Sequence, residues 1–94
     1  MKLIKIERLH GDKHKYRAIF DNDGKHKTTK FGASGYDDFL SHGSEERKNR
    51  YRLRHEKDLL THDPTRAGFL SYYILWNKPT LEASIADYKR RFNL

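Results

Sequence analysis

The sequence predicts an α+β domain: a three-stranded antiparallel meander over residues 1–31, followed by about three helices within residues 36–94. Alternating side chains and tight-turn residues in the first third are typical of β-hairpins. Apolar residues at helical spacing after residue 66 indicate a helix pair, which we expect to pack on the sheet. At 94 residues the chain fits a single domain.

The first two strands are expected over residues 2–10 and 15–21. The second alternates apolar with polar or outward-facing side chains, as a half-buried strand does. Asp23-Gly24 follows it, and an Asp-Gly pair is among the strongest signals for a two-residue hairpin turn. One face of the sheet is predicted to be apolar through Ile4, Ile6, Tyr16, Ala18 and Phe20.

The third strand is predicted over residues 25–31, where cations alternate with threonine and histidine. This composition favours an edge strand that lysine protects from pairing with other chains. Residues 1–35 also carry most of the net positive charge, +5 of the +7 for the whole chain. The sheet, with Lys25, Lys27 and Lys30, is therefore one predicted cationic surface.

Helices are predicted after a flexible joint at residues 32–35. A single turn is expected over residues 36–40, and Ser44 is expected to cap a mostly polar helix that runs to about Leu60. Its expected anchors are Tyr51, Leu59 and Leu60.

The last third holds most of the core-forming side chains. A helix that begins near Arg66 must end before Pro79, because proline cannot continue it. Thr80 is a good cap for a final helix, whose apolar side chains share one face: Leu81, Ile85, Tyr88 and Phe92. Trp76 is expected to lock the corner between these helices, and Asn77 to cap the first of them.

The composition indicates an acidic partner. Charged residues make up 35% of the chain, and the net charge is +7. Such a balance points first to nucleic acid, and second to an anionic protein or membrane surface. Cysteine is absent, which excludes disulfides, zinc–thiolate sites and cysteine nucleophiles. No stretch has the length of a membrane span, and the N-terminal charges are too closely spaced for a signal peptide.

Five cations fall within residues 47–54, and three of them, Arg47, Arg50 and Arg54, share one helix face with Tyr51. Guanidinium groups bind phosphate through two parallel hydrogen bonds, so this row can act as a clamp on a nucleic-acid backbone. Ordinary surface ion pairs are the alternative. The pairs with four-residue spacing are Glu46–Arg50, Arg52–Glu56 and Arg54–Asp58.

Other patterns give little sign of catalysis. His10, His14 and His26 lie on neighbouring strands, but without further ligands they do not predict a metal site. Asp37 and Asp38 are expected to cap a helix or to pair with the arginine helix. No nucleophile motif or phosphate loop is present. We therefore expect no enzyme activity, no catalytic residues, no metal and no cofactor.

Several segments resemble a family of small basic proteins encoded by large nucleocytoplasmic DNA viruses, relatives of phycodnaviruses and mimiviruses, and found in some algae. The resemblance covers residues 31–93. Its most specific segments are Ala67-Gly68-Phe69 and Leu75-Trp76-Asn77-Lys78-Pro79-Thr80, with Gly35-Tyr36-Asp37-Asp38-Phe39 and Arg50-Tyr51 earlier in the chain. It implies a viral or virus-derived origin, located in the virion or in the host cytoplasm or nucleus, but no established activity.

Two functional hypotheses follow. The first is an accessory protein that binds nucleic acid, in particular the DNA backbone, without reading sequence. Its phosphate-binding residues would be Lys25, Lys27, Lys30, Arg47, Arg50 and Arg54. The alternative is a structural protein of the virion, a minor capsid or cement component, with capsid proteins as partners. Neither hypothesis involves a membrane.

Overall fold

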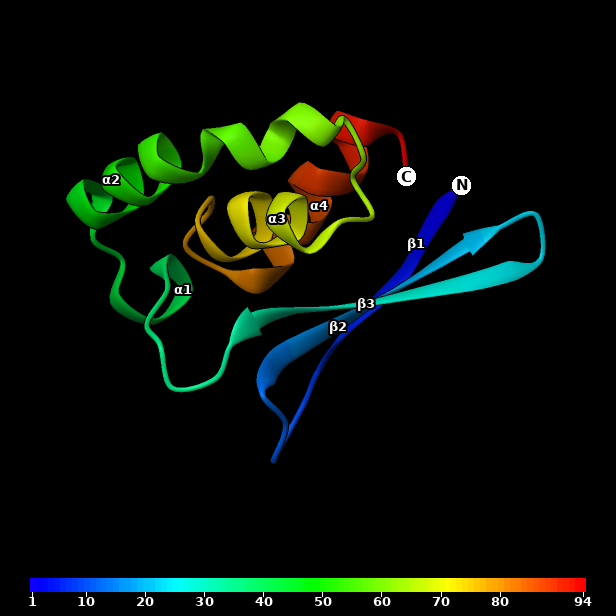
Figure 1. Cartoon of the computed structure of the whole chain (residues 1–94), viewed down its shortest axis with the longest axis horizontal. Coiled ribbons are helices and arrows are strands. Elements are labelled where there is room, and N and C mark those ends of the chain that lie inside the picture. The colour runs from blue at the N-terminus through cyan, green and yellow to red at the C-terminus, as the bar shows by residue number, and fades with distance from the viewer.

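The computed structural model describes all 94 residues and confirms the α+β class (Figure 1). An antiparallel sheet in the order β1-β2-β3 is built from β1 (Lys2–Arg8), β2 (His14–Asn22) and β3 (Lys25–Ala33). The helices follow as α1 (Phe39–His42), α2 (Glu45–His55), the 3-10 segment η1 (Glu56–Thr61), α3 (Ala67–Leu70), the π-helical η2 (Ser71–Leu75) and α4 (Leu81–Phe92).

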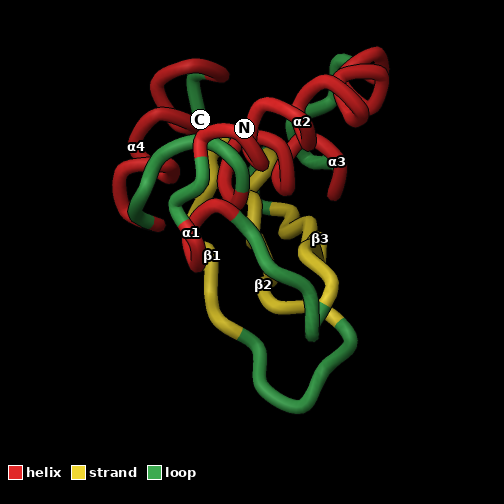
Figure 2. Tube along the Cα trace, turned by 90° about the vertical axis from the view of Figure 1, so that its left-hand side faces the viewer, coloured by secondary structure: helices red, strands yellow, loops and turns green.

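The molecule has two layers. The helices gather on one side of the sheet, and the two termini lie next to each other in both views (Figures 1 and 2). α3 and η2 contact β3 directly, so the later helices pack on the sheet as predicted. None of the helices combines the length and the apolar character that crossing a membrane requires.

The turn between β2 and β3 has the predicted geometry. Asp23 and Gly24 have positive φ angles of 53° and 84°. Two successive positive φ angles are typical of a type I′ turn, whose twist matches that of the flanking strands. The Asp21 side chain accepts a hydrogen bond from the Gly24 amide at 3.0 Å, and Asn22 pairs with Lys25 across the turn.

The prediction for β1 was wrong at one position. The register shifts between Leu3 and Lys5, so Leu3 pairs with Phe20 and Ile6 pairs with Ala18. Because a bulge adds one residue to the strand, Leu3 and Ile6 reach the core although they are three apart. Leu3 is 3% exposed, whereas Ile4, which we predicted on the core face, is 44% exposed.

The core joins the sheet to the helices through large side chains. Ala18, Phe20 and Phe31 come from the sheet, and Tyr88 from α4 is fully buried among them. The Tyr88 hydroxyl donates a hydrogen bond to the Pro64 carbonyl, and burial raises the pKa of Tyr88 far above its usual value. The other members of the predicted apolar face of α4 pack partly buried against this core: Leu81, Ile85 and Phe92.

Three helices differ from the predictions. The single turn expected over residues 36–40 lies at Phe39–His42 instead, because Asp38 is its N-cap. The polar helix is α-helical only to His55 and then tightens into η1, where Leu59 packs against the core but Leu60 remains 74% exposed. Leu60 is therefore not an anchor. The apolar helix begins at Ala67 as expected, but its second half, η2, has the wider π-helical turn.

The corner after η2 is held by polar contacts from two other helices. Asn77 Nδ2 donates to Asp87 Oδ2 of α4 at 2.7 Å, in a buried contact, so Asn77 bonds to α4 and does not cap the preceding helix. From α2, Arg52 Nε donates to the Trp76 carbonyl at 2.7 Å and Lys48 Nζ donates to the Asn77 carbonyl at 3.2 Å. These cations satisfy carbonyls that the end of a helix leaves unpaired.

Replacing Asp87 tests this corner. Burial favours the neutral carboxyl, but the hydrogen bond from Asn77 and the Arg91 guanidinium outweigh it and lower the pKa of Asp87 below its ordinary value of 3.8. Its contribution to stability is therefore full above that value and is lost as the pH falls toward the lowered folded pKa. We expect Asp87→Asn to lower the free energy of unfolding by about 2 kcal/mol at neutral pH.

The measurement is urea unfolding followed by circular dichroism at neutral pH and near pH 3. The difference between wild type and Asp87→Asn should shrink at the lower pH. The control is Glu82→Gln, which changes an exposed carboxylate of the same helix. An Asp87→Asn variant with wild-type stability at neutral pH would contradict the assignment.

Gly68 of α3 lies against η1. A β-carbon added there would stand 2.9 Å from Asp58 Cβ, closer than side-chain carbons normally approach. We expect Gly68→Ala to destabilise the fold by about 1 kcal/mol, because overpacking outweighs the gain in helix propensity. Thermal unfolding checks this, and a variant more stable than wild type would show that η1 moves aside freely.

Candidate nucleic-acid interface

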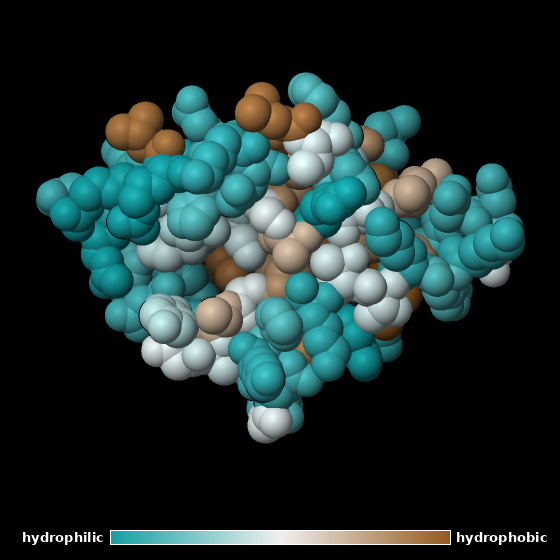
Figure 3. Space-filling model, in the orientation of Figure 1, coloured by the Kyte–Doolittle hydropathy of each residue, from teal (hydrophilic) through white to brown (hydrophobic).

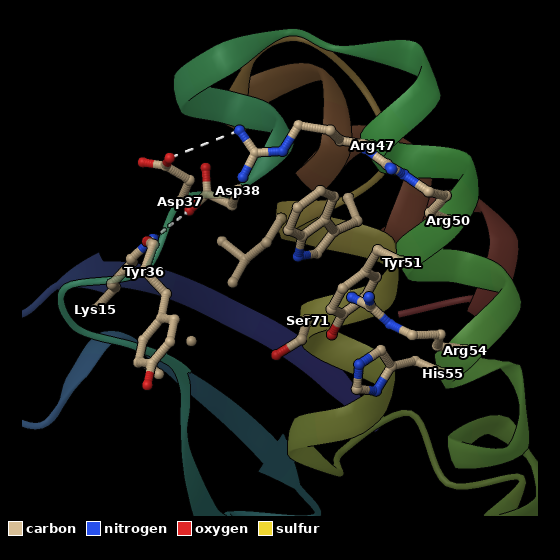
Figure 4. A pocket seen from close by; sticks show the side chains of 14 residues that line it. Lys15, Tyr36, Asp37, Asp38, Arg47, Arg50, Tyr51, Arg54, His55 and Ser71 are labelled. Carbon is tan, nitrogen blue, oxygen red and sulfur yellow. Dashed lines mark hydrogen bonds and ion pairs between the residues drawn. The ribbon is translucent and has the colours of Figure 1, made fainter.

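A cleft opens between α2 and the loop that follows β3. Its volume is about 550 Å³. Figure 3 shows a hollow in this region whose bottom contains apolar surface and whose rim is hydrophilic. Figure 4 shows its side chains, which come from β2, the end of β3, the loop at residues 34–38, α2, η2 and Trp76 directly after η2. Volumes of this size are typical of sites for small ligands or for parts of larger ones.

One wall of the cleft is the predicted arginine row. Arg47, Arg50 and Arg54 all line it, as the three- and four-residue spacing predicted (Figure 4). Ser44 caps α2 as expected, with its hydroxyl oxygen accepting from the Arg47 amide. The structure therefore brings half of the predicted phosphate-binding residues to a single concave surface.

The row makes few ion pairs. Arg47 lies 3.7 Å from Asp37, and Arg50 lies 4.0 Å from Glu46. Arg54 makes no ion pair, because Asp58 instead bonds to His55 Nδ1 at 3.0 Å. Only Glu46–Arg50 of the three alternative surface pairs is present, and it is long and exposed. Pairs of this kind contribute between about 0 and 1 kcal/mol, so the guanidinium groups are available to a ligand.

The two other cations of α2 point away from the cleft and into the fold. Besides their bonds to the corner carbonyls, Arg52 stacks over the Tyr72 ring at 4.5 Å and Lys48 lies over the Phe39 ring at 4.7 Å. Lys48 and Arg52 are four residues apart and so share a face different from that of the arginine row. α2 thus has two cationic faces: one packs against the corner after η2, and the other lines the cleft.

Stacked rings form the floor of the cleft. The Tyr51 ring lies between His55, at 4.2 Å, and Trp76, at 4.3 Å with an interplanar angle of 7°. Burial, followed by the Asp58 carboxylate, raises the pKa of Tyr51, although the Ser71 hydroxyl and Arg54 oppose the shift. Trp76, predicted to be structural, is 8% exposed and supports this stack.

The opposite wall is the loop that carries Tyr36, Asp37 and Asp38. Lys15 of β2 fixes it: its ammonium group bonds to the Tyr36 carbonyl and lies 2.7 Å from Asp38 Oδ2. Asp38 also caps α1 by accepting from the Ser41 amide at 3.0 Å. The expectation of capping and pairing for the two aspartates is confirmed, since Asp37 faces Arg47. Tyr36 stands across the opening from Ser71 and His55 and is 74% exposed.

The sheet lysines do not form one surface. Lys27 pairs with Phe20 on the core face of the sheet and donates to the Thr65 hydroxyl at 2.8 Å, and Lys25 lies on the same side at the hairpin end. Because side chains alternate along a strand, Lys30 lies on the other face. There it bonds to Asp12 at 2.8 Å, and this contact, with the His14 amide, lowers the pKa of Asp12 to about 2. None of the three lines the cleft.

No group of three or more histidine, aspartate or glutamate side chains is placed to hold a metal ion. The cleft offers cations, a hydroxyl and aromatic rings, which suit binding of an anionic, partly aromatic ligand. Lys15, Tyr36 and Ser71 were not predicted as site residues. A tyrosine directly after the flexible joint at residues 32–35 was the only sequence signal for any of them.

Among known proteins, the chain matches one family model. No curated protein and no solved structure matches the chain. The model of a family of unknown function (DUF5754) matches residues 4–55, which include most of the sheet, the loop after β3 and α2. The match overlaps the resemblance described above only over residues 31–55, and it shows no viral or algal origin. It spans more than half of the sequence, and the chain therefore belongs to the family of unknown function DUF5754.

Proposed function

We propose that this protein binds nucleic acid without sequence preference, through phosphate contacts in the cleft. The observation that carries the proposal is the arginine row: Arg47, Arg50 and Arg54 share one wall of a concave site and are weakly paired or unpaired. Arginine matches phosphate oxygens in geometry and keeps its charge at all relevant pH values. Phosphate contacts supply most of non-specific nucleic-acid affinity.

The charge of the site agrees with this proposal. Four cations and two carboxylates line the cleft, which leaves a net charge of +2 with His55 neutral. Asp38 is already neutralised by Lys15, so of the two carboxylates that line the cleft only Asp37 competes directly with a phosphate. A chain with a net charge of +7 also attracts a polyanion from a distance.

The alternative role, a virion structural protein, draws less support from the surface. The exposed large hydrophobic side chains come from separate elements: Met1 and Ile4 from the start of the chain, Tyr36 from the loop after β3, Leu53 from α2 and Leu60 from η1. On the face shown in Figure 3 the apolar groups are divided by hydrophilic surface. A structural contact would call for a larger continuous patch. A viral setting rests on the resemblance of residues 31–93 alone and belongs to the proposal.

The salt dependence of binding tests the proposal. Fluorescence anisotropy with a labelled random-sequence oligonucleotide, from about 50 to about 200 mM salt, should give a linear fall of log affinity with log salt. Arg50→Ala and Arg54→Ala should each reduce the slope by about one phosphate contact. Lys57→Ala removes the same charge from an exposed residue outside the cleft and serves as the control. Equal effects of all three variants would mean that only total charge matters.

Removing the competing carboxylate should act in the opposite direction. Asp37→Asn frees Arg47 from its partner at 3.7 Å and deletes a negative charge beside the phosphate path. We expect affinity to rise up to about 5-fold, since an exposed pair contributes at most about 1 kcal/mol. Asp23→Asn, at the far hairpin, is the matched control. Unchanged or weaker binding by Asp37→Asn would place the ligand outside this cleft.

A further inference from the structure

Tyr36 presents an aromatic ring at the edge of the cleft that no other side chain covers. It is 74% exposed, whereas Tyr51 has both faces occupied by His55 and Trp76. Large exposed aromatic rings beside a cationic wall suit stacking of a planar group carried by an anion. The ring and the arginines lie on opposite sides of the same opening (Figure 4).

The backbone at Tyr36 is fixed before any ligand arrives. The Lys15 ammonium group bonds to the Tyr36 backbone carbonyl and to the Asp38 carboxylate, and both partners of that ion pair are close to fully buried, at 11% and 6% exposed side-chain surface. Asp38 is in turn the N-cap of α1. Because the backbone that carries the ring is already ordered, binding costs less conformational entropy in this loop, which favours affinity.

We propose that the cleft binds a single-stranded nucleic acid, with an unpaired base stacked on Tyr36 and the adjoining phosphates on Arg47, Arg50 and Arg54. This inference rests on the proposed function and names its substrate class. The three arginines span about 10 Å of α2, at 1.5 Å per residue, so they can follow a run of backbone rather than one phosphate. A single strand supplies both matching groups: a base for the Tyr36 ring and successive phosphates for the arginine row.

A duplex fits the cleft poorly. Its bases are stacked on each other and cannot reach Tyr36, and its phosphates lie on a convex rod that touches only the outer edge of a concave site. α2 cannot enter a major groove with its arginine row, because that row faces the loop across the cleft. A flexible single strand can bend into the opening, and stacking of its bases on aromatic rings tolerates any sequence.

Binding of a short labelled oligothymidine and of a matched duplex to the 94-residue protein tests the inference. Tyr36→Ala should weaken single-strand binding about 10-fold or more, because the stacked base loses its partner. Tyr36→Phe keeps the ring and should bind as wild type does. Neither variant should change duplex binding or the salt slope, since no charge is removed. Circular dichroism checks that both Tyr36 variants are folded.

An abasic oligonucleotide of equal length provides an independent check. It keeps every phosphate and lacks the base, so wild type should bind it as weakly as Tyr36→Ala binds oligothymidine, and Tyr36→Ala should bind both strands equally. Equal affinity for single strand and duplex, or unchanged single-strand binding by Tyr36→Ala, would overturn this inference and leave the proposed function in place. Failure of every oligonucleotide to bind at low salt would overturn both.

Discussion

The geometry of the cleft depends on how α2 is attached to the corner between η2 and α4. Lys48 and Arg52 donate to the backbone carbonyls of Asn77 and Trp76, and Tyr51 stacks on the Trp76 ring. A polar helix with no buried residue cannot be held by hydrophobic packing alone. These contacts fix its rotation about its own axis, because they place one face on the corner. The remaining cationic face is thereby turned toward the loop after β3.

As a result, cations of the same residue type have different roles: some stabilise the fold, and others line the cleft. In α2, Lys48 and Arg52 donate to carbonyls and lie over aromatic rings, while the arginine row makes only two long ion pairs. A cation of the sheet also has a structural role: Lys15 forms a buried ion pair with Asp38, which holds the opposite wall of the cleft. Several cations of this strongly basic protein thus stabilise its own fold, and the proposed binding surface is smaller than the net charge suggests.

The cleft is assembled from segments far apart in the chain. Lys15, Tyr36, the arginine row and Ser71 come from a strand, a loop and two helices. The family match covers all of these except Ser71, and the floor residues Leu75 and Trp76 also lie beyond it. Two walls of the site therefore lie within the family match, whereas the floor combines Tyr51 and His55 of α2, also within the match, with residues of the C-terminal corner.

The sequence by itself determined the class of fold, the hairpin turn at Asp23-Gly24, the cap at Ser44 and the buried face of α4, because each depends on local conformation or on periodicity within one element. It also determined that Arg47, Arg50 and Arg54 share a face. Only the tertiary structure decided which cations are free, since lysine and arginine look the same in a sequence whether they meet a carbonyl, a ring or water. It also decided that Leu3 replaces Ile4 in the core, because the bulge that reverses their faces is fixed by pairing with β2.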